Sequence, residues 1–311
     1  MSKKGKKEKI DFAVGGQAVI EGVMMRSPNF IAIAVRKPSK KIKIKSYPYK
    51  TLTQRYKALN IPIIRGVINL FEMMYVGTKA INYSANESVE ENPTPQHKKS
   101  TPLKVFETFM FVFSFILALA LAIFLFKYLP LLTASFLETK STQIEQNYLL
   151  FNAIDGITKL MIFLAYIFLL SLIPSFRRVF QYHGAEHKSI FTYEKEKPLK
   201  PQFAKLQSRF HPRCGTSFII IVFLISIIVY TFIPKQDSFT LNLSYRIAFL
   251  PLIAGLAYEA LKLSAKYCKN IIVRALTLPG LWTQRITTKE PTESQLEVGL
   301  CALEKVLELE K

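Results

Sequence analysis

Cysteine is scarce in this sequence, with three residues among 311 and no regular spacing between them. An odd number without a framework pattern excludes a disulfide scaffold. The first residues, MSKKGKKEKID, also lack the apolar run that a secretory signal peptide requires. We therefore expect the three thiols, those of Cys214, Cys268 and Cys301, to face a reducing cytosol.

Acidic residues are the second shortage. The chain has 22 Asp and Glu against 42 Lys and Arg, a formal charge of +20, although half of its residues are apolar. One soluble core does not accommodate so many cations together with so much apolar surface, so the two must occupy different parts of the chain. This combination excludes both a disordered polycation and an ordinary soluble enzyme.

Charged residues are missing altogether from three long blocks: residues 108–126, 160–176 and 214–234, with 19, 17 and 21 residues. Each block is long enough, or nearly so, to cross about 30 Å of hydrocarbon at 1.5 Å per residue. A fourth apolar block, residues 247–258, has only 12 residues and contains Pro251. It is either an interrupted span or a re-entrant hairpin.

Loop charge orients the predicted spans, because Lys and Arg accumulate on the cytoplasmic side. The first fifty residues hold 13 cations and three acids, and residues 174–215 hold nine cations and three acids. Residues 262–289 carry six cations and no acid, whereas residues 127–148 and 235–246 carry only two cations each. We therefore predict four spans with both termini in the cytoplasm.

Three segments outside the blocks have patterns of their own. Alternating β-branched residues at 12–49 predict a small cytoplasmic β-unit of three or four strands. Residues 64–86 predict an amphipathic helix that lies on the membrane or packs on the spans. Near the end, Ser294 and Glu297 form the pattern of a capping box in front of a helix with one leucine face.

The predicted fold is thus an α-helical integral membrane protein with about four transmembrane helices, a small β-unit at the amino end and amphipathic helices. Its predicted parts are a basic tail with the β-unit (1–56), an amphipathic helix with a polar linker (57–104), two spans (105–173), a cytoplasmic loop rich in His and Cys (174–216), two further spans (217–262) and a cytoplasmic region with an amphipathic helix (263–311).

The lysine-rich start, KKGKKEK, bears on partners. No aromatic platform or recognition helix accompanies it, so we expect it to be attracted to anionic lipid beside the bilayer and not to nucleic acid. The leucine face of the last helix predicts docking within the chain, on a protein partner or on a second copy of the chain.

Three of the four histidines lie in the loop between the second and third blocks. His183 and His187 in YHGAEHKS are four residues apart, so on a helix both imidazoles lie on one face and can share a metal ion. With Glu186 they form H-x-x-E-H, the reverse of the common zinc-protease order, in which the glutamate acts as general base on a zinc-bound water. In HPRCG, His211 and Cys214 resemble a zinc-binding knuckle.

Two kinds of metal site are open. If all four candidate ligands bind, a Zn²⁺ ion is saturated and the site is structural. If three bind, the fourth position takes water, whose pKa falls toward about 7, and hydrolysis becomes possible. Glu259 is a candidate distant ligand, or an ion-pair partner of Lys262. Without a metal, the same histidines can cap helices or bind lipid phosphates.

The motif GGQAVIEGVMMR predicts a β-hairpin whose glycines permit turns. Alternation places Val19, Val23 and Met25 on one face together with Glu21, and Arg26 on the other. A glutamate among apolar neighbours needs a cation or a metal as partner. We therefore expect Glu21 to reach toward the histidine loop, and treat Glu21 and Arg26 as a further candidate site.

The blocks GGQAVIEGVMMR, YHGAEHKS, HPRCGTSF and PGLW followed by TTKEPTESQLEV resemble, in one order along nearly the whole chain, the YqhQ-like family of bacterial polytopic membrane proteins. That family is a domain of unknown function whose members are described as predicted metal-dependent enzymes. The resemblance implies an inner-membrane location. It supports the five residues of the histidine and cysteine motifs as the site, and it implies no substrate.

Three functional hypotheses follow. The first is a membrane protein whose cytoplasmic zinc site hydrolyses a membrane-associated lipid or peptide, with Glu186 as general base. The second is a non-enzymatic assembly or interaction factor in which the metal holds the loop together. A transporter is less favoured, because the first three blocks contain no internal ionisable residue of the kind that marks an ion path.

Overall fold

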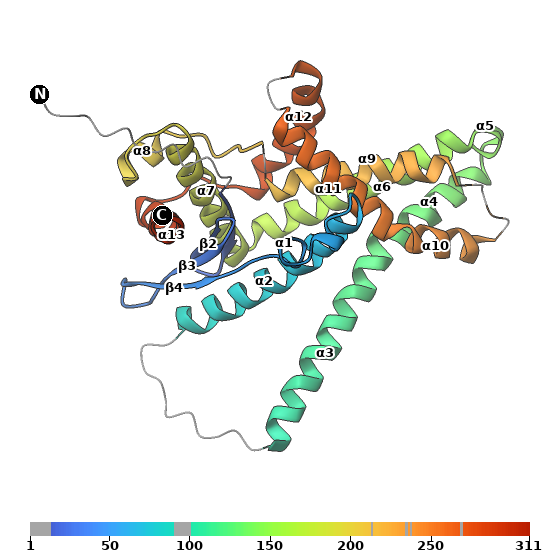
Figure 1. Ribbon diagram of the computed structural model, residues 1–311. Helices are drawn as coiled ribbons and strands as arrows, with labels where there is room; N and C mark the ends of the chain where they lie inside the picture. Colours follow the sequence, from blue (N-terminus) through green and yellow to red (C-terminus); the bar gives the residue numbers. More distant parts are fainter. Residues whose placement is uncertain (1–13, 90–100, 213, 234–235, 237, 268–269) are drawn as a thin grey trace, which may run out of the picture.

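The computed structural model describes residues 14–89, 101–212, 214–233, 236, 238–267 and 270–311 (Figure 1). It begins with four strands, β1 (Gly15–Val19), β2 (Gly22–Arg26), β3 (Phe30–Arg36) and β4 (Ile42–Pro48). The helices that follow are α1 (Leu52–Arg55), the short 3₁₀ helix η1 (Lys57–Leu59), α2 (Ile64–Val89), α3 (Thr101–Ile123), the π-helical turn η2 (Phe124–Tyr128), α4 (Leu129–Glu138), α5 (Thr142–Gln146), α6 (Tyr148–Leu172), α7 (Pro174–Glu194), α8 (Pro201–Lys205), α9 (Gly215–Thr231), α10 (Phe239–Ala248), α11 (Leu250–Lys266), α12 (Ile271–Thr287) and α13 (Glu293–Glu310). The predicted lysine tail and most of the predicted linker lie outside the described residues.

The four strands form one antiparallel sheet in the order β1-β2-β3-β4, which confirms the predicted β-unit. β1 and β2 are joined by a two-residue turn, since Val19 pairs with Gly22. Residues paired across two antiparallel strands share a face, so this turn shifts the alternation. Val19 therefore lies on one face with Met24, while Val23 and Met25 lie on the other. The prediction that Val19, Val23 and Met25 share a face is wrong for this reason.

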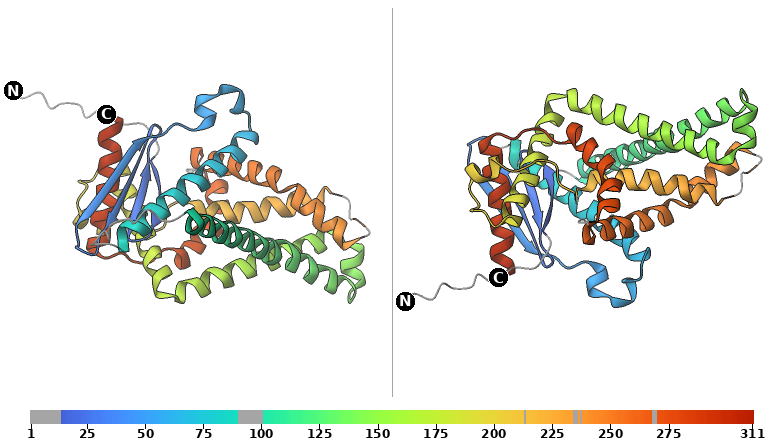
Figure 2. Two further views of the ribbon diagram at one scale, coloured as in Figure 1. Left: turned by 90° about the horizontal axis from the view of Figure 1, so that it is seen from below. Right: turned by 90° about the horizontal axis from the view of Figure 1, so that it is seen from above.

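Helices cover both faces of the sheet (Figure 2). Val23 and Met25 pack on α7 and α13, with Tyr182 and Leu303 in the same core. On the other face, Val19, Met24 and the isoleucines of β3 pack on Val76 and Ala80 of α2. The sheet thus fixes α7, which carries the histidine motif, against α13 and the amino end of the chain.

The start of α13 differs from the prediction. Its capping box is formed by Thr292 and Gln295, each of which binds the other's backbone N–H through its side chain. The predicted box of Ser294 and Glu297 is wrong by two residues. Glu297 instead forms an ion pair with Arg36 at the end of β3.

Two continuous helices are long and apolar enough to cross a membrane: residues 112–138, which run through α3, η2 and α4, and α6. A third candidate is the pair α10 and α11, which bends by 43° at its junction. α9 is apolar as well but has only 17 residues. Within the described residues, length and composition therefore support two spans, or three if the bent pair is one span. α6, α9 and α11 run side by side, whereas α3 diverges from them (Figure 1).

The helices extend beyond the charge-free blocks. The first long helix continues past Phe126 and includes Lys127, and α6 begins twelve residues before its block and includes Asp155 and Lys159. All three charged side chains are buried. The prediction that residues 127–148 form a loop is therefore wrong for residues 127–138, which continue the first long helix. Asp155 and Lys159 form an ion pair and Lys127 binds the Tyr230 hydroxyl, contacts that a count of apolar residues does not reveal.

α2 packs on α11 through two glycines, since a Cβ at Gly66 would lie 3.1 Å from the Cα of Gly255. Arg65 of α2 forms an ion pair with Glu259 of α11, and Asn69 donates a hydrogen bond to the Tyr258 hydroxyl. Polar residues of this amphipathic helix thus make contacts with another helix. This confirms that α2 packs on a candidate span.

Candidate metal centre

α7 positions the histidine motif. The helix starts with Pro174 at its first position, where a missing N–H costs no helical hydrogen bond, and only Ile173 separates it from the end of α6. His183 and His187 follow on one face, as their spacing predicts, with ring centroids 4.4 Å apart. His187 is 2% exposed and faces the interior of the protein, whereas His183 is partly exposed.

Cys214 joins the two histidines from another part of the chain. It is the amino-terminal cap of α9, where its Sγ accepts a hydrogen bond from the backbone N–H of Thr216. The same sulfur lies 3.2 Å from Nε2 of His183. The possible ligand atoms of His183, His187 and Cys214 all lie within 4.8 Å of one another. Ligand atoms around a tetrahedral zinc ion are about 3.5 Å apart, so a small contraction brings the three into range.

Backbone carbonyls fix the orientation of both imidazoles. Nδ1 of His183 lies 2.8 Å from the carbonyl oxygen of Thr287, and Nδ1 of His187 lies 2.5 Å from that of Arg209. A carbonyl only accepts, so Nδ1 carries the proton in both rings and Nε2 is left with its lone pair. This is the outer-shell arrangement of histidines that bind a metal.

Burial favours the neutral, metal-binding form of His187. The pKa of His187 is lowered, chiefly because burial disfavours the charged ring. Metal ligands must be deprotonated, so a neutral imidazole needs no proton to be displaced from Nε2. The donor set of two nitrogens and one sulfur is one that Zn²⁺ accepts in proteins. The residues present therefore fit a zinc ion.

His211 has different contacts from those predicted. Its backbone is held on both sides by Gln284, which accepts from the His211 N–H and donates to the His211 carbonyl, each at 2.8 Å. Its ring packs on Phe191, and its Nε2 lies 3.3 Å from a carboxylate oxygen of Glu194. Burial lowers the pKa of His211 to about 4. The structure places His211 beside the three-residue group and does not include it in that group.

Glu186 points toward the sheet. Its carboxyl accepts a hydrogen bond from the backbone of Gly16 in β1, and a Cβ at Gly16 would lie 2.8 Å from Cγ of Glu186. Burial raises the pKa of this carboxyl, while the nearby His183 and His211 act in the opposite direction. The close approach requires a residue without a side chain at position 16, which explains the glycine there.

Glu21 contacts the same helix as the histidines but not the histidines themselves. Its carboxylate pairs with the Arg178 guanidinium and accepts a hydrogen bond from the Tyr182 hydroxyl at 3.2 Å. Glu21 adopts a positive φ of 51° in the turn between β1 and β2. Its partner is therefore a cation of α7, one of the two kinds of partner that its sequence context requires.

Arg26 and Glu259 lie elsewhere. Arg26 is on the α2 face of the sheet, where it donates to the sulfur of Met73 and lies over the Tyr49 ring. Burial lowers the pKa of its guanidinium. Glu259 pairs with Arg65, with 2.6 Å between Oε1 and Nε, and does not belong to the group formed by His183, His187 and Cys214.

Thr287 and Arg209 also belong to the site, but they bind the histidines through their backbone carbonyls. Their side chains therefore gave no indication of this role in the sequence. Glycines are the residues in the sequence that could have indicated these close contacts between segments. A Cβ at Gly184 would overlap the carbonyl oxygen of Lys289, and one at Gly280 would lie 2.6 Å from Oγ of Ser217. The sequence blocks that carry the family resemblance thus meet at glycines, where one segment passes directly over another.

The fold and the site define a mostly helical protein with helices long enough to span a membrane and a His–His–Cys group, two of its members buried, that could hold a metal ion. A family described as protein of unknown function DUF1385 matches residues 61–309. The chain is also 34% identical to the uncharacterized protein YqhQ of Bacillus subtilis (strain 168), over 98% of this chain and 95% of that protein. The chain belongs to the DUF1385 family, which confirms the resemblance seen in its motifs. No solved structure matches it.

Proposed function

We propose that this chain is a four-span protein of the bacterial inner membrane, with both termini in the cytoplasm, and that its His–His–Cys group binds zinc and serves hydrolysis of a membrane lipid. One observation carries the proposal: three protein side chains converge, and backbone carbonyls bind Nδ1 of both imidazoles, so that Nε2 is the nitrogen left for a metal. Structural zinc sites use four protein ligands, whereas catalytic sites use three and leave one position open.

His183, His187 and Cys214 would hold the ion, with the thiol deprotonated on binding. When bound, zinc supplies Lewis-acid chemistry, because it polarises a substrate oxygen and lowers the pKa of water to about 7. The carbonyls of Thr287 and Arg209 keep the rings in place during this chemistry.

Glu186 is the group we assign to proton transfer. Its carboxyl is close enough to His183 to interact with it electrostatically, and the Gly16 N–H holds the carboxyl in one orientation. It would accept the proton of the attacking water and deliver it to the leaving group, the ordinary role of a general base and acid.

The surroundings favour an anionic lipid over a peptide. Lys289 follows closely after Thr287, and its pKa is lowered by burial and by the nearby guanidinium groups of Arg209 and Arg177. Three cations beside one site attract an anionic headgroup. α7 also begins one residue after α6, which places the site close to the end of a candidate span.

The first experiment measures zinc in the detergent-purified chain by elemental analysis, and its ligands by X-ray absorption. We expect about one zinc per chain with two nitrogen ligands, one sulfur ligand and one oxygen. His187→Ala should lose the metal. A wild-type protein without stoichiometric metal would refute the proposal.

The second experiment follows hydrolysis of vesicles that contain an anionic glycerophospholipid. Glu186→Gln should keep its zinc but lose activity by roughly 10²- to 10⁴-fold, the usual contribution of a general base. Glu196→Gln, at an exposed position just after α7, is the matched control and should keep both. If Glu186→Gln is as active as wild type, Glu186 is not the base.

A second candidate function rests on the burial of Glu186 against the sheet. In a non-enzymatic assembly factor, the metal would tie α7 to α9 and hold the sheet beside them. This candidate predicts no hydrolysis of any vesicle tested, together with a fall in the unfolding temperature when zinc is removed. A saturated four-ligand site in the absorption spectrum would favour it.

A further inference from the structure

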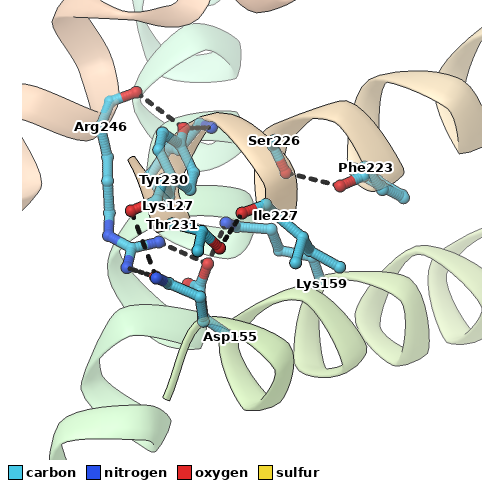
Figure 3. A network of polar contacts seen from close by, with 10 residues as sticks. Lys127, Asp155, Lys159, Phe223, Ser226, Ile227, Tyr230, Thr231 and Arg246 are labelled. Atoms are coloured by element: carbon cyan, nitrogen blue, oxygen red, sulfur yellow. Dashed lines mark hydrogen bonds and ion pairs between the residues drawn. The ribbon is translucent and has the colours of Figure 1, made fainter. Parts of the chain in front are cut away.

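A second polar cluster lies buried among the apolar helices (Figure 3), and its Tyr230 is near the end of α9 opposite to the end capped by Cys214 of the metal centre. We call it the membrane cluster. Each of its side chains is 8% exposed or less, and together they come from four separate helical elements. Its members are Lys127 of η2, Asn152, Asp155 and Lys159 of α6, Tyr230 of α9 and Arg246 of α10.

One carboxylate oxygen serves two cations. Oδ2 of Asp155 accepts from the Lys159 ammonium and from Nη1 of Arg246, the latter at 2.5 Å. Nη2 of Arg246 donates to the side-chain oxygen of Asn152 at 2.7 Å. These bonds join α6 to α10 inside the helical bundle.

The Tyr230 ring is the centre of the cluster. Lys127, Lys159 and Arg246 lie over it, with the charged groups 5.3, 4.9 and 4.5 Å from the ring centroid. Lys127 also donates to the Tyr230 hydroxyl at 2.8 Å, and that hydroxyl donates to the Arg246 carbonyl at 3.0 Å. Contacts with an aromatic face offset only part of the cost of burying a cation.

The charges of the cluster do not balance. Three cations face one carboxylate, which leaves a surplus of two positive charges when all four groups are ionised. Unpaired charge is costly inside a protein and more so within a bilayer, where ionisable residues mark functional sites. The surplus matches the charge of a dianion.

The carboxylate provides a second, independent observation. Oδ1 of Asp155 is buried and has no hydrogen-bond donor among the residues that the structure describes. A buried acceptor without a donor is rare in folded proteins. A ligand that satisfies it must carry a proton of its own, which chloride, sulfate and an ionised carboxylate lack. A hydrogenphosphate dianion has both two negative charges and one O–H.

The backbone is irregular at two of the cations. Lys127 lies in the π-helical turn η2, just before Pro130, which has no N–H to continue the α-helical pattern. Arg246 lies shortly before the 43° bend between α10 and α11. π-turns are frequent at functional sites, and interrupted helices within a membrane commonly line binding sites.

We propose that the membrane cluster binds a phosphate-type oxyanion that retains one proton. Lys127, Lys159 and Arg246 donate to its charged oxygens, and Oδ1 of Asp155 accepts its O–H. The lysine ammonium groups are at the ends of flexible four-carbon chains, so they can turn from the Tyr230 ring to the anion. This site is independent of the metal centre and of the hydrolase proposal.

The test is equilibrium binding of radiolabelled inorganic phosphate to the full chain in phosphatidylcholine nanodiscs, with sulfate as competitor. We expect saturable binding of about one phosphate per chain, and at least tenfold weaker competition by sulfate. Lys127→Met should weaken phosphate binding at least tenfold. Lys140→Met, at an exposed position two residues after α4, is the matched control and should bind as wild type does.

Asp155→Asn tests the proton. The amide oxygen should stay with Lys159 and Arg246, which leaves the amide N–H₂ where the acceptor was. Phosphate binding should fall at least tenfold and the preference over sulfate should disappear. If a variant does not fold, the wild-type titration still decides: sulfate that competes as well as phosphate overturns the assignment. Lys127→Arg, which keeps the charge, should retain binding.

The source of the oxyanion is resolved with nanodiscs that contain phosphatidic acid, whose headgroup is a phosphomonoester. Competition between this lipid and inorganic phosphate would assign the site to a lipid headgroup. Phosphate binding that the lipid does not affect would assign it to the free ion. Absence of saturable binding of both overturns the proposal.

Discussion

The membrane cluster is buried throughout, whereas the metal centre of His183, His187 and Cys214 is partly exposed at His183, and the polar groups of the two sites are of different kinds. In the metal centre, two imidazole rings and a thiol converge, and backbone carbonyls bind the ring nitrogens that face away. In the membrane cluster, charged side chains from different helices depend on one carboxylate, that of Asp155. The first site should therefore respond most to changes in ligands and chain path, and the second to changes in charge.

The largest effect should come from removing Asp155. Asp155→Leu leaves three buried cations without a carboxylate, and breaking a buried ion pair costs about 3–5 kcal/mol. Unfolding in detergent should show this loss. The double variant Asp155→Leu with Lys159→Leu should recover part of it, because one stranded cation is removed as well. Equal stability of the single and double variants would contradict the charge argument.

The second largest effect should come from removing one of the candidate metal ligands, Cys214. Cys214→Ala deletes the sulfur that contacts His183, so zinc affinity should fall by more than the roughly 100-fold that the loss of an outer-shell partner costs. A competition titration with a chelator measures this. Cys301→Ala, in α13, is the control and should retain wild-type affinity. Unchanged affinity in Cys214→Ala would exclude the thiol as a ligand.

The chain path near the site is tested by two adjacent glycines. A Cβ at Gly16 would lie 2.7 Å from the backbone oxygen of Met24 and 2.8 Å from Glu186, whereas a Cβ at Gly15 meets nothing within 4 Å. Gly16→Ala should destabilise the protein by about 1–3 kcal/mol, as overpacking does. Gly15→Ala should not. Thermal unfolding of both variants compares them, and equal melting temperatures would disprove the close contact.

The smallest effect should come from removing the carboxylate of Glu87, whose ion pairs lie near the surface of the protein. Burial raises the pKa of Glu87, but its ion pairs with Lys43 and Lys37 outweigh burial and the pKa is lowered. The stabilisation is therefore present above the unfolded-state pKa of about 4.3 and is lost as the pH falls through the folded-state value. Glu87→Gln should cost less than about 1 kcal/mol at pH 7 and nothing at pH 3. A difference that persists at pH 3 would have another cause.

Local patterns predicted several elements well. The alternation at 12–49 predicted the sheet, and residues 64–86 correspond closely to α2. The spacing of His183 and His187 predicted two rings on one helix face. In each case, the information lies within a few residues of the element that it describes, so the sequence is sufficient.

Contacts between distant segments could not be predicted in the same way. Lys127 and Asp155 are buried because they bind Tyr230 and Arg246 of other helices. Spans predicted from hydropathy alone were therefore too short. The two-residue turn reversed the face of Val19, which alternation cannot show. His211 and Cys214 are close in sequence, but Gln284 holds the His211 backbone, and only the cysteine joins the group.

The junction of α6 and α7 determines how far the metal centre lies from the end of α6. A single residue, Ile173, separates the two helices, so no loop provides slack between them. His183 follows Pro174 by nine residues, or about 14 Å of helix. The length of α7 between Pro174 and His183 therefore fixes the distance of the metal centre from the end of α6. A substrate therefore meets the metal centre only if its reacting group comes within about 14 Å of the end of α6. The rest of the substrate can extend farther.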